Sequence, residues 1–115
     1  MNGSILNTIK QLLGISSSDD SFDVNVIISI NSVLTILSQM GLSEADGFVI
    51  TGTTEEWSEL IGSRTDLEFV KTYIGLKVKL MFDPPSSSAA MEAIKRTIDE
   101  LEWRITNIYV KKEES

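Results

Sequence analysis

The chain has 115 residues, 42% of them apolar, and a formal net charge of −7 at pH 7. This length and composition fit one small folded domain and exclude a disordered chain. Cysteine and histidine are both absent, which removes disulfides, thiolate sites and the usual general base near neutral pH. Most common catalytic and metal-binding designs are therefore excluded, and neither enzymatic activity nor a cofactor is expected.

The acidic balance also limits the possible partners. A free-standing nucleic-acid binder usually carries a basic patch that neutralises phosphates, and the sequence shows no such patch. Residues 1–14 lack the apolar run of a signal peptide. Nothing in the chain approaches the ~20 consecutive apolar residues of a membrane-spanning helix. We therefore expect no direct DNA-binding role and no membrane partner.

Two helices are predicted in the first forty residues. Ile5 to Leu13 carry apolar side chains at the spacing i, i+3, i+4, i+7, which predicts a short amphipathic helix ending at Gly14. Phe22 to Met40 is ambiguous, because its first half alternates β-branched residues like a strand while its second half has helical spacing. Since no turn signal divides the segment, a single buried helix ending at Gly41 is the preferred interpretation.

The middle of the chain is less regular. Leu42 to Thr53 shows no clear period. Thr53-x-x-Glu56 matches a capping box, in which two side chains satisfy opposing backbone donors. We therefore predict a short helix from Thr54 to Ile61, ended by Gly62.

Asp66 to Phe82 is predicted to form the central helix of the fold. Two apolar stripes run side by side along it, and a helix that is apolar over so much of its circumference lies in the middle of a fold. The stripes consist of Leu67, Val70, Ile74, Val78 and Met81, and of Phe69, Tyr73, Leu76 and Leu80. Gly75 costs about 1 kcal/mol relative to alanine inside a helix, which predicts a neighbouring backbone close to it.

The residues Asp83, Pro84 and Pro85 must end that helix, because proline lacks an amide hydrogen and disfavours helical geometry in the preceding residue. Serines 86 to 88 then cap a last helix, from Ala89 to about Tyr109. Its apolar seam has heptad spacing and consists of Met91, Ile94, Ile98, Leu101, Ile105 and Ile108. Fewer than four heptads and the proline turn favour packing within the chain over a coiled coil between chains.

These elements predict an all-α fold. It is a small helical bundle built on an antiparallel hairpin of the two long helices, joined by the Asp-Pro-Pro turn, with shorter N-terminal and central helices covering the open face. Residues 1–110 are expected to form one domain, and residues 111–115 a charged tail.

The aromatic side chains outside the stripes have two interpretations each. Trp57, which lies among glutamates, is interpreted as a cap on the core rather than a partner anchor. Trp103 and Tyr109 lie off the seam of the last helix, and the core interpretation is again preferred, although both residue types are frequent interface hot spots. Lys111 and Lys112 are interpreted as a solvated helix end that complements the helix dipole.

One block of sequence resembles a known family. Residues 70–85, VKTYIGLKVKLMFDPP, and the continuation that ends in IDELEWRI at residue 105 are similar to the C-terminal half of head–tail connector proteins of long-tailed double-stranded DNA phages and prophages. These are also called adaptor or head-completion proteins. The close resemblance spans about 36 residues, and the first half of the chain agrees in layout alone.

The resemblance implies a virion structural protein without catalytic activity. Subunits of this family assemble as a ring, dodecameric like the portal, beneath the portal protein at the capsid vertex. The ring extends the DNA channel, so DNA passes through the ring but is not a binding partner. The ring also docks the head-closure (stopper) or tail-completion protein. The implied location is the neck of the virion, and the bacterial cytoplasm during assembly. The implied portal-contact segment is Trp103 to Ser115, with Trp103, Tyr109, Lys111 and Lys112 as candidate contacts.

Two other functions fit the same helices and charge. The first is an acidic helical adaptor or regulatory protein that binds a host or phage protein through an exposed groove. The second is an enzyme that uses serine or aspartate chemistry. Paired carboxylates occur at Asp19-Asp20, Glu55-Glu56 and Asp99-Glu100, but adjacent residues on a helix do not face each other, so these spacings do not build an acid/base pair.

Overall fold

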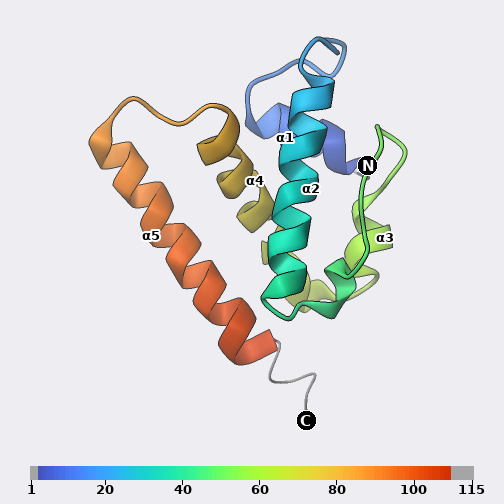
Figure 1. Cartoon of the computed structure of the whole chain (residues 1–115), viewed down its shortest axis with the longest axis vertical. Helices are drawn as coiled ribbons and strands as arrows, with labels where there is room; N and C mark the ends of the chain where they lie inside the picture. Colours follow the sequence, from blue (N-terminus) through green and yellow to red (C-terminus); the bar gives the residue numbers. More distant parts are fainter. Residues whose placement is uncertain (1–2, 110–115) are drawn as a thin grey trace.

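The structure is a computed structural model that describes residues 3–109, with side chains described as far as residue 107. Within this range every regular secondary-structure element is a helix (Figure 1). The elements are α1 (Ile5–Leu12), α2 (Asp23–Gln39), η1 (Ser43–Ala45), α3 (Trp57–Ile61), η2 (Thr65–Leu67), α4 (Phe69–Phe82), α5 (Ser88–Arg104) and the π-helical turn η3 (Ile105–Tyr109). The predicted all-α bundle is confirmed.

The ambiguous segment forms the single helix α2, so the helical interpretation is confirmed. Helical spacing places one row of aliphatic side chains on a common face, and that row is completely buried. It consists of Val26, Ile30, Val33, Leu34 and Leu37. A strand would have divided these residues between two faces, so the long-range packing decides against the local β-propensity.

The centre of the fold is α4, against which α2 makes its most extensive packing. Both predicted stripes of α4 contribute to the core, and Val70, Tyr73, Ile74 and Val78 are completely buried. Met81 departs from the prediction because it is half exposed. It lies in the last turn of the helix, next to the Asp-Pro-Pro segment.

Residues 83–87 connect α4 to α5, and the Ser87 hydroxyl caps α5 by accepting a hydrogen bond from the amide of Ala90. In Figure 1, α5 stands to one side of the bundle and comes closer to it toward its C-terminal end. The predicted seam is therefore only partly buried. Ile98 and Ile105 are buried, whereas Met91, Ile94 and Leu101 are partly exposed.

The start of α3 differs from the prediction. The helix begins at Trp57 rather than Thr54, and its capping box is formed by Glu56 and Glu59 rather than by Thr53. The carboxylate of Glu59 accepts a hydrogen bond of 2.9 Å from the amide of Glu56. The reason is a short extended pairing with the N-terminal segment, in which the Trp57 amide donates to the carbonyl of Gly3. Extended backbone there delays the helix by three residues.

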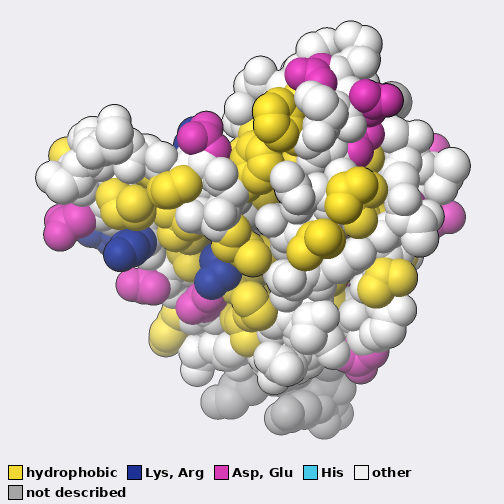
Figure 2. Space-filling model, turned by 45° about the horizontal axis from the view of Figure 1, so that its top comes forward, with side chains coloured by type: hydrophobic (Ala, Val, Ile, Leu, Met, Phe, Trp, Pro, Cys, Tyr) yellow, Lys and Arg dark blue, Asp and Glu magenta, His cyan; other side chains and the backbone are white. Residues whose placement is uncertain are grey.

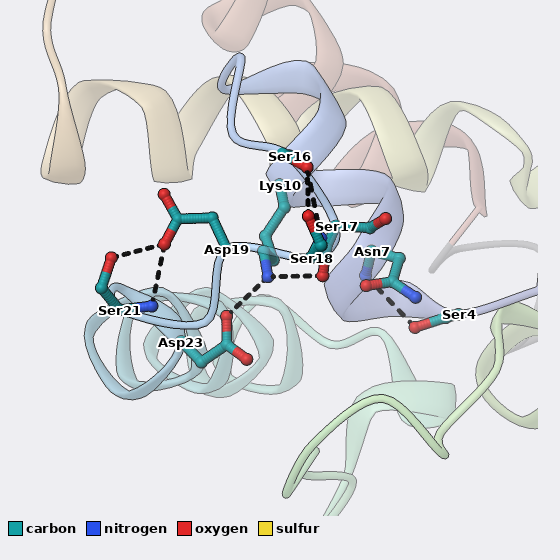
Figure 3. A network of polar contacts seen from close by, with 9 residues as sticks. All are labelled: Ser4, Asn7, Lys10, Ser16, Ser17, Ser18, Asp19, Ser21 and Asp23. Atoms are coloured by element: carbon teal, nitrogen blue, oxygen red, sulfur yellow. Dashed lines mark hydrogen bonds and ion pairs between the residues drawn. The ribbon is translucent and has the colours of Figure 1, made fainter.

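A buried ion pair joins α1 to the first turn of α2 (Figure 3). The ammonium group of Lys10, whose side chain is 1% exposed, lies 2.8 Å from Asp23 Oδ1. It also donates a 3.3 Å hydrogen bond to the carbonyl of Ser17. In the same connection, hydrogen bonds from the hydroxyl and amide of Ser21 lower the pKa of Asp19. These polar contacts fix the chain between the two helices.

Removing the partner of Lys10 should be costly. In Asp23→Ala the ammonium group stays buried without a counter-ion, and we expect a loss of about 2–3 kcal/mol of unfolding free energy, since Asp23 is partly exposed and fully buried pairs lose somewhat more. Lys10→Met keeps the apolar stem, and we expect a cost below about 1 kcal/mol. Urea denaturation followed by circular dichroism measures both values. Equal losses in the two variants would contradict this account.

Gly75 is in close contact, but with a side chain and not with the backbone that we predicted. A Cβ atom at this position would lie 2.7 Å from Cδ1 of Leu12, at the end of α1. The glycine therefore makes room for Leu12 to lie across α4.

The two positions should be energetically coupled. Gly75→Ala alone should change stability by less than about 1 kcal/mol, because the gain in helix propensity is opposed by displacement of Leu12. In a Leu12→Ala background, the same substitution should stabilise the fold by about 1 kcal/mol. A double-mutant cycle of thermal unfolding measures the difference, and additive effects would show that the contact is unimportant.

Candidate functional site

The C-terminal half of α5 is held against the bundle by apolar and polar contacts. Ile98 and Ile105 are buried on the side of α5 that faces the core. The hydroxyl of Tyr73, a completely buried residue of α4, donates a 2.8 Å hydrogen bond to Glu102 Oε2. Lys77 Nζ lies 3.8 Å from the same carboxylate oxygen. Together these contacts fix the orientation of the helix end.

This orientation exposes Trp103. The side chain is 59% exposed, so the preferred core interpretation of this residue was wrong. The physical reason is its position on the helix, since Ile98 and Ile105 face the core and Trp103 lies about 140° around the helix from Ile98. The carbonyl of Trp103 accepts hydrogen bonds from the side chains of Thr106 and Asn107. A large aromatic side chain thus lies in solvent on a fixed helix end.

The other predicted contact residues follow Trp103 in the sequence. Tyr109 is the last residue of η3, and its side chain lies outside the described residues. Lys111 and Lys112 also lie outside them. The turn residues Asp83, Pro84 and Pro85 precede the opposite end of α5, and a helix of 17 residues is about 25 Å long. The structure therefore separates the turn from Trp103.

Trp57 is confirmed as a core residue. It is buried, and its indole nitrogen donates a 3.0 Å hydrogen bond to the hydroxyl of Thr8 in α1. The ammonium group of Lys71 lies 5.6 Å from the ring centroid, within the range of a cation–π contact. The side chain thus ties α3 to α1 and α4 and is not available to a partner.

The polar groups of the described residues do not form a metal site. Among residues 3–107, no group of three or more Asp or Glu side chains is arranged to hold a metal ion. An open hollow of about 570 Å³ lies beside α1, lined mainly by hydroxyl and amide side chains together with Glu56. Such a lining can hydrogen-bond to a polar ligand or to a peptide backbone.

The comparison with protein families decides the assignment. A family model described as phage connector protein matches residues 5–112, which includes every helix of the fold. The chain belongs to the phage connector protein family. The resemblance seen in residues 70–105 is thereby confirmed and extends to the first half of the connector. No curated protein and no solved structure matches the chain.

Family membership gives the connector a coarse function. It is a phage structural protein of the head–tail connector type, a component of the virion, and it acts in contact with other head or tail proteins. None of the helices in the described part of the connector is both long enough and apolar enough to cross a membrane.

Two features of this surface were not predicted from the sequence. The exposure of Trp103 had a signal, because the residue lies off the heptad seam of its helix. The hydrogen bond between Tyr73 and Glu102 had none, because the two residues are 29 positions apart and nothing local pairs them.

The buried phenol of Tyr73 should make the free energy of unfolding fall at alkaline pH. Burial, and secondarily the bond to Glu102, raise the pKa of Tyr73 well above its usual range. Above about pH 10 the unfolded phenol loses its proton while the folded phenol keeps it, so stability falls as pH rises. Tyr73→Phe should lower stability by about 1–2 kcal/mol at pH 7 and remove this additional loss.

Urea denaturation from pH 7 to strongly alkaline pH measures the difference between the two proteins. Both share all other titrating groups, so those groups largely cancel in the comparison. Parallel pH profiles would contradict the assignment of the slope to Tyr73.

Proposed function

We propose that this chain is a head–tail connector subunit that assembles as a ring under the portal protein. The ring extends the DNA channel and docks the head-closure or tail-completion protein. The observation that carries the proposal is the family match over residues 5–112. Residues 1–110 act as one helical domain in this proposal, and residues 111–115 as a charged tail.

The portal-contact segment is proposed to begin at the end of α5. Trp103 is exposed there on a helix end held by Glu102 and Ile105. An exposed tryptophan on a rigid support loses little conformational entropy on binding, and tryptophan is enriched among interface hot spots. Tyr109, Lys111 and Lys112 follow in sequence and are the further candidate contacts.

The charge distribution supports a role in which DNA passes without binding. Residues 1–63 contain eight acidic residues and a single basic residue, Lys10. That lysine is buried against Asp23. An acidic wall repels the phosphate backbone, so DNA can slide past without forming contacts that must later be broken.

The direct test is assembly on the portal encoded by the same phage. The purified chain is mixed with purified portal rings, and the product is imaged by electron microscopy and analysed by sedimentation. We expect an additional ring of density on one face of the portal. Absence of binding over the whole accessible concentration range would overturn the proposal, whereas a monomeric state of the free chain would not.

Trp103→Ala should weaken portal binding at least tenfold, which corresponds to 1.4 kcal/mol. Because the side chain is exposed, we expect the free energy of unfolding to change by less than about 0.5 kcal/mol. Val49→Ala, which truncates another exposed apolar side chain, is the matched control and should bind normally. Equal affinities of the two variants would exclude Trp103 from the interface.

A further inference from the structure

The first half of α2 carries two exposed apolar side chains on the side that faces away from the core. Val24 is 70% exposed and Ile28 is 59% exposed. They lie one turn apart, on the side of α2 opposite its buried row, and branched side chains at i and i+4 form the kind of ridge that packs into grooves between helices. We call Val24 and Ile28 the α2 ridge.

A second apolar surface lies between α4, α5 and the end of α1. The N-terminal half of α5 stands away from the bundle (Figure 1), and Figure 2 shows hydrophobic side chains gathered between α5 and the rest of the molecule. A cavity of about 250 Å³ opens there. Its lining, called here the α4–α5 groove, consists of Leu12, Thr72, Gly75, Leu76, Lys79 and Ile94. The single charge of that lining is the ammonium group of Lys79, which lies 3.4 Å from Asp83 Oδ2 at the end of α4.

The charges flanking the two surfaces are complementary. The α2 ridge follows the exposed carboxylates of Asp19 and Asp20 and belongs to the strongly acidic residues 1–63. Apart from Leu12, the α4–α5 groove is lined by side chains from residues 69–104, which contain six basic and five acidic residues. Two ridges brought face to face would place like charges together, whereas a ridge in a groove places acidic groups near Lys79.

We propose that the α2 ridge of one copy packs into the α4–α5 groove of a second copy. The contact is heterologous, so an open chain of subunits has a free ridge at one end and a free groove at the other, and in the proposed ring these two surfaces meet. This inference rests on the proposed function, because it names the surfaces through which connector subunits associate. It also explains why apolar side chains remain exposed on an otherwise acidic surface.

Cysteine cross-linking tests this contact directly, since the natural chain has no cysteine. The variants Ile28→Cys, on the ridge, and Ile94→Cys, in the groove, are purified separately, mixed in equal amounts and oxidised with diamide. We expect disulfide-linked heterodimers that exceed the homodimers formed by either variant alone by at least tenfold. Mass spectrometry of the linked peptides identifies the pair.

The matched control replaces Ile94→Cys by Arg96→Cys. Arg96 lies on the same helix, its side chain is 77% exposed, and it is about 200° around the helix from Ile94. It should cross-link to Ile28→Cys only at the background rate. Thermal unfolding of the reduced variants verifies that each is folded.

The substitution Ile28→Ser in the natural chain should weaken self-association at least tenfold, and analytical sedimentation measures this change.

The experiment is performed on the free chain over a concentration series and on the chain bound to portal rings. Cross-linking between positions 28 and 94 above the Arg96→Cys control supports the contact. Cross-linking at or below the control in both samples overturns it. Portal binding is measured in the same samples by co-sedimentation, so a ring that forms without this cross-link would refute the proposed surfaces and leave the connector function intact.

Discussion

The burial of α2 against α4 positions the other elements of the fold. Each fully buried aliphatic side chain contributes about 1.5–3 kcal/mol relative to an exposed one, and both helices contribute a continuous row of them. Helix α1 packs on both members of the pair, η1 packs on α2, and α5 packs on α4. The amide of Asn31 in α2 also holds the loop after η1 through two hydrogen bonds to the backbone of Ile50. This loop, whose sequence shows neither helical nor strand periodicity, is thereby fixed to α2.

The dependence of the other elements on the packing of α2 against α4 explains which features could be predicted from the sequence. The long helices and their buried rows follow from spacing alone, because helical periodicity reports directly which face is buried. The start of α3 could not be predicted, because it depends on pairing between Gly3 and Trp57, which are far apart in sequence. The neighbour of Gly75 was wrongly predicted for the same reason. A glycine inside a helix indicates that something lies close, but only the fold identifies it as Leu12.

The candidate contact surface also has some features that the sequence predicts and others that it does not. The heptad seam predicts that α5 buries one face, yet only its C-terminal half packs closely, so Ile98 is buried and Met91 is not. How far a helix is covered depends on the length and direction of its connection to the preceding helix, and residues 83–87 do not encode this in a local pattern. The opening of the α4–α5 groove results from this partial packing, whereas Trp103 is exposed because it lies about 140° around the helix from the buried Ile98. Family membership then gives these surfaces a biological context, because a connector must contact other proteins of the virion.

The pairing of the N-terminal segment with the start of α3 has a consequence for the order of folding. The amide of Ile5 donates to the carbonyl of Glu55, and the amide of Trp57 donates to the carbonyl of Gly3. These bonds close a loop of about fifty residues, and the entropy of closing that loop must be offset before either segment is fixed. During synthesis the chain emerges from the N-terminus, so residue 57 becomes available long after α1. We therefore expect α1, which leaves the ribosome before α3, to reach its final position only after α3 has been made.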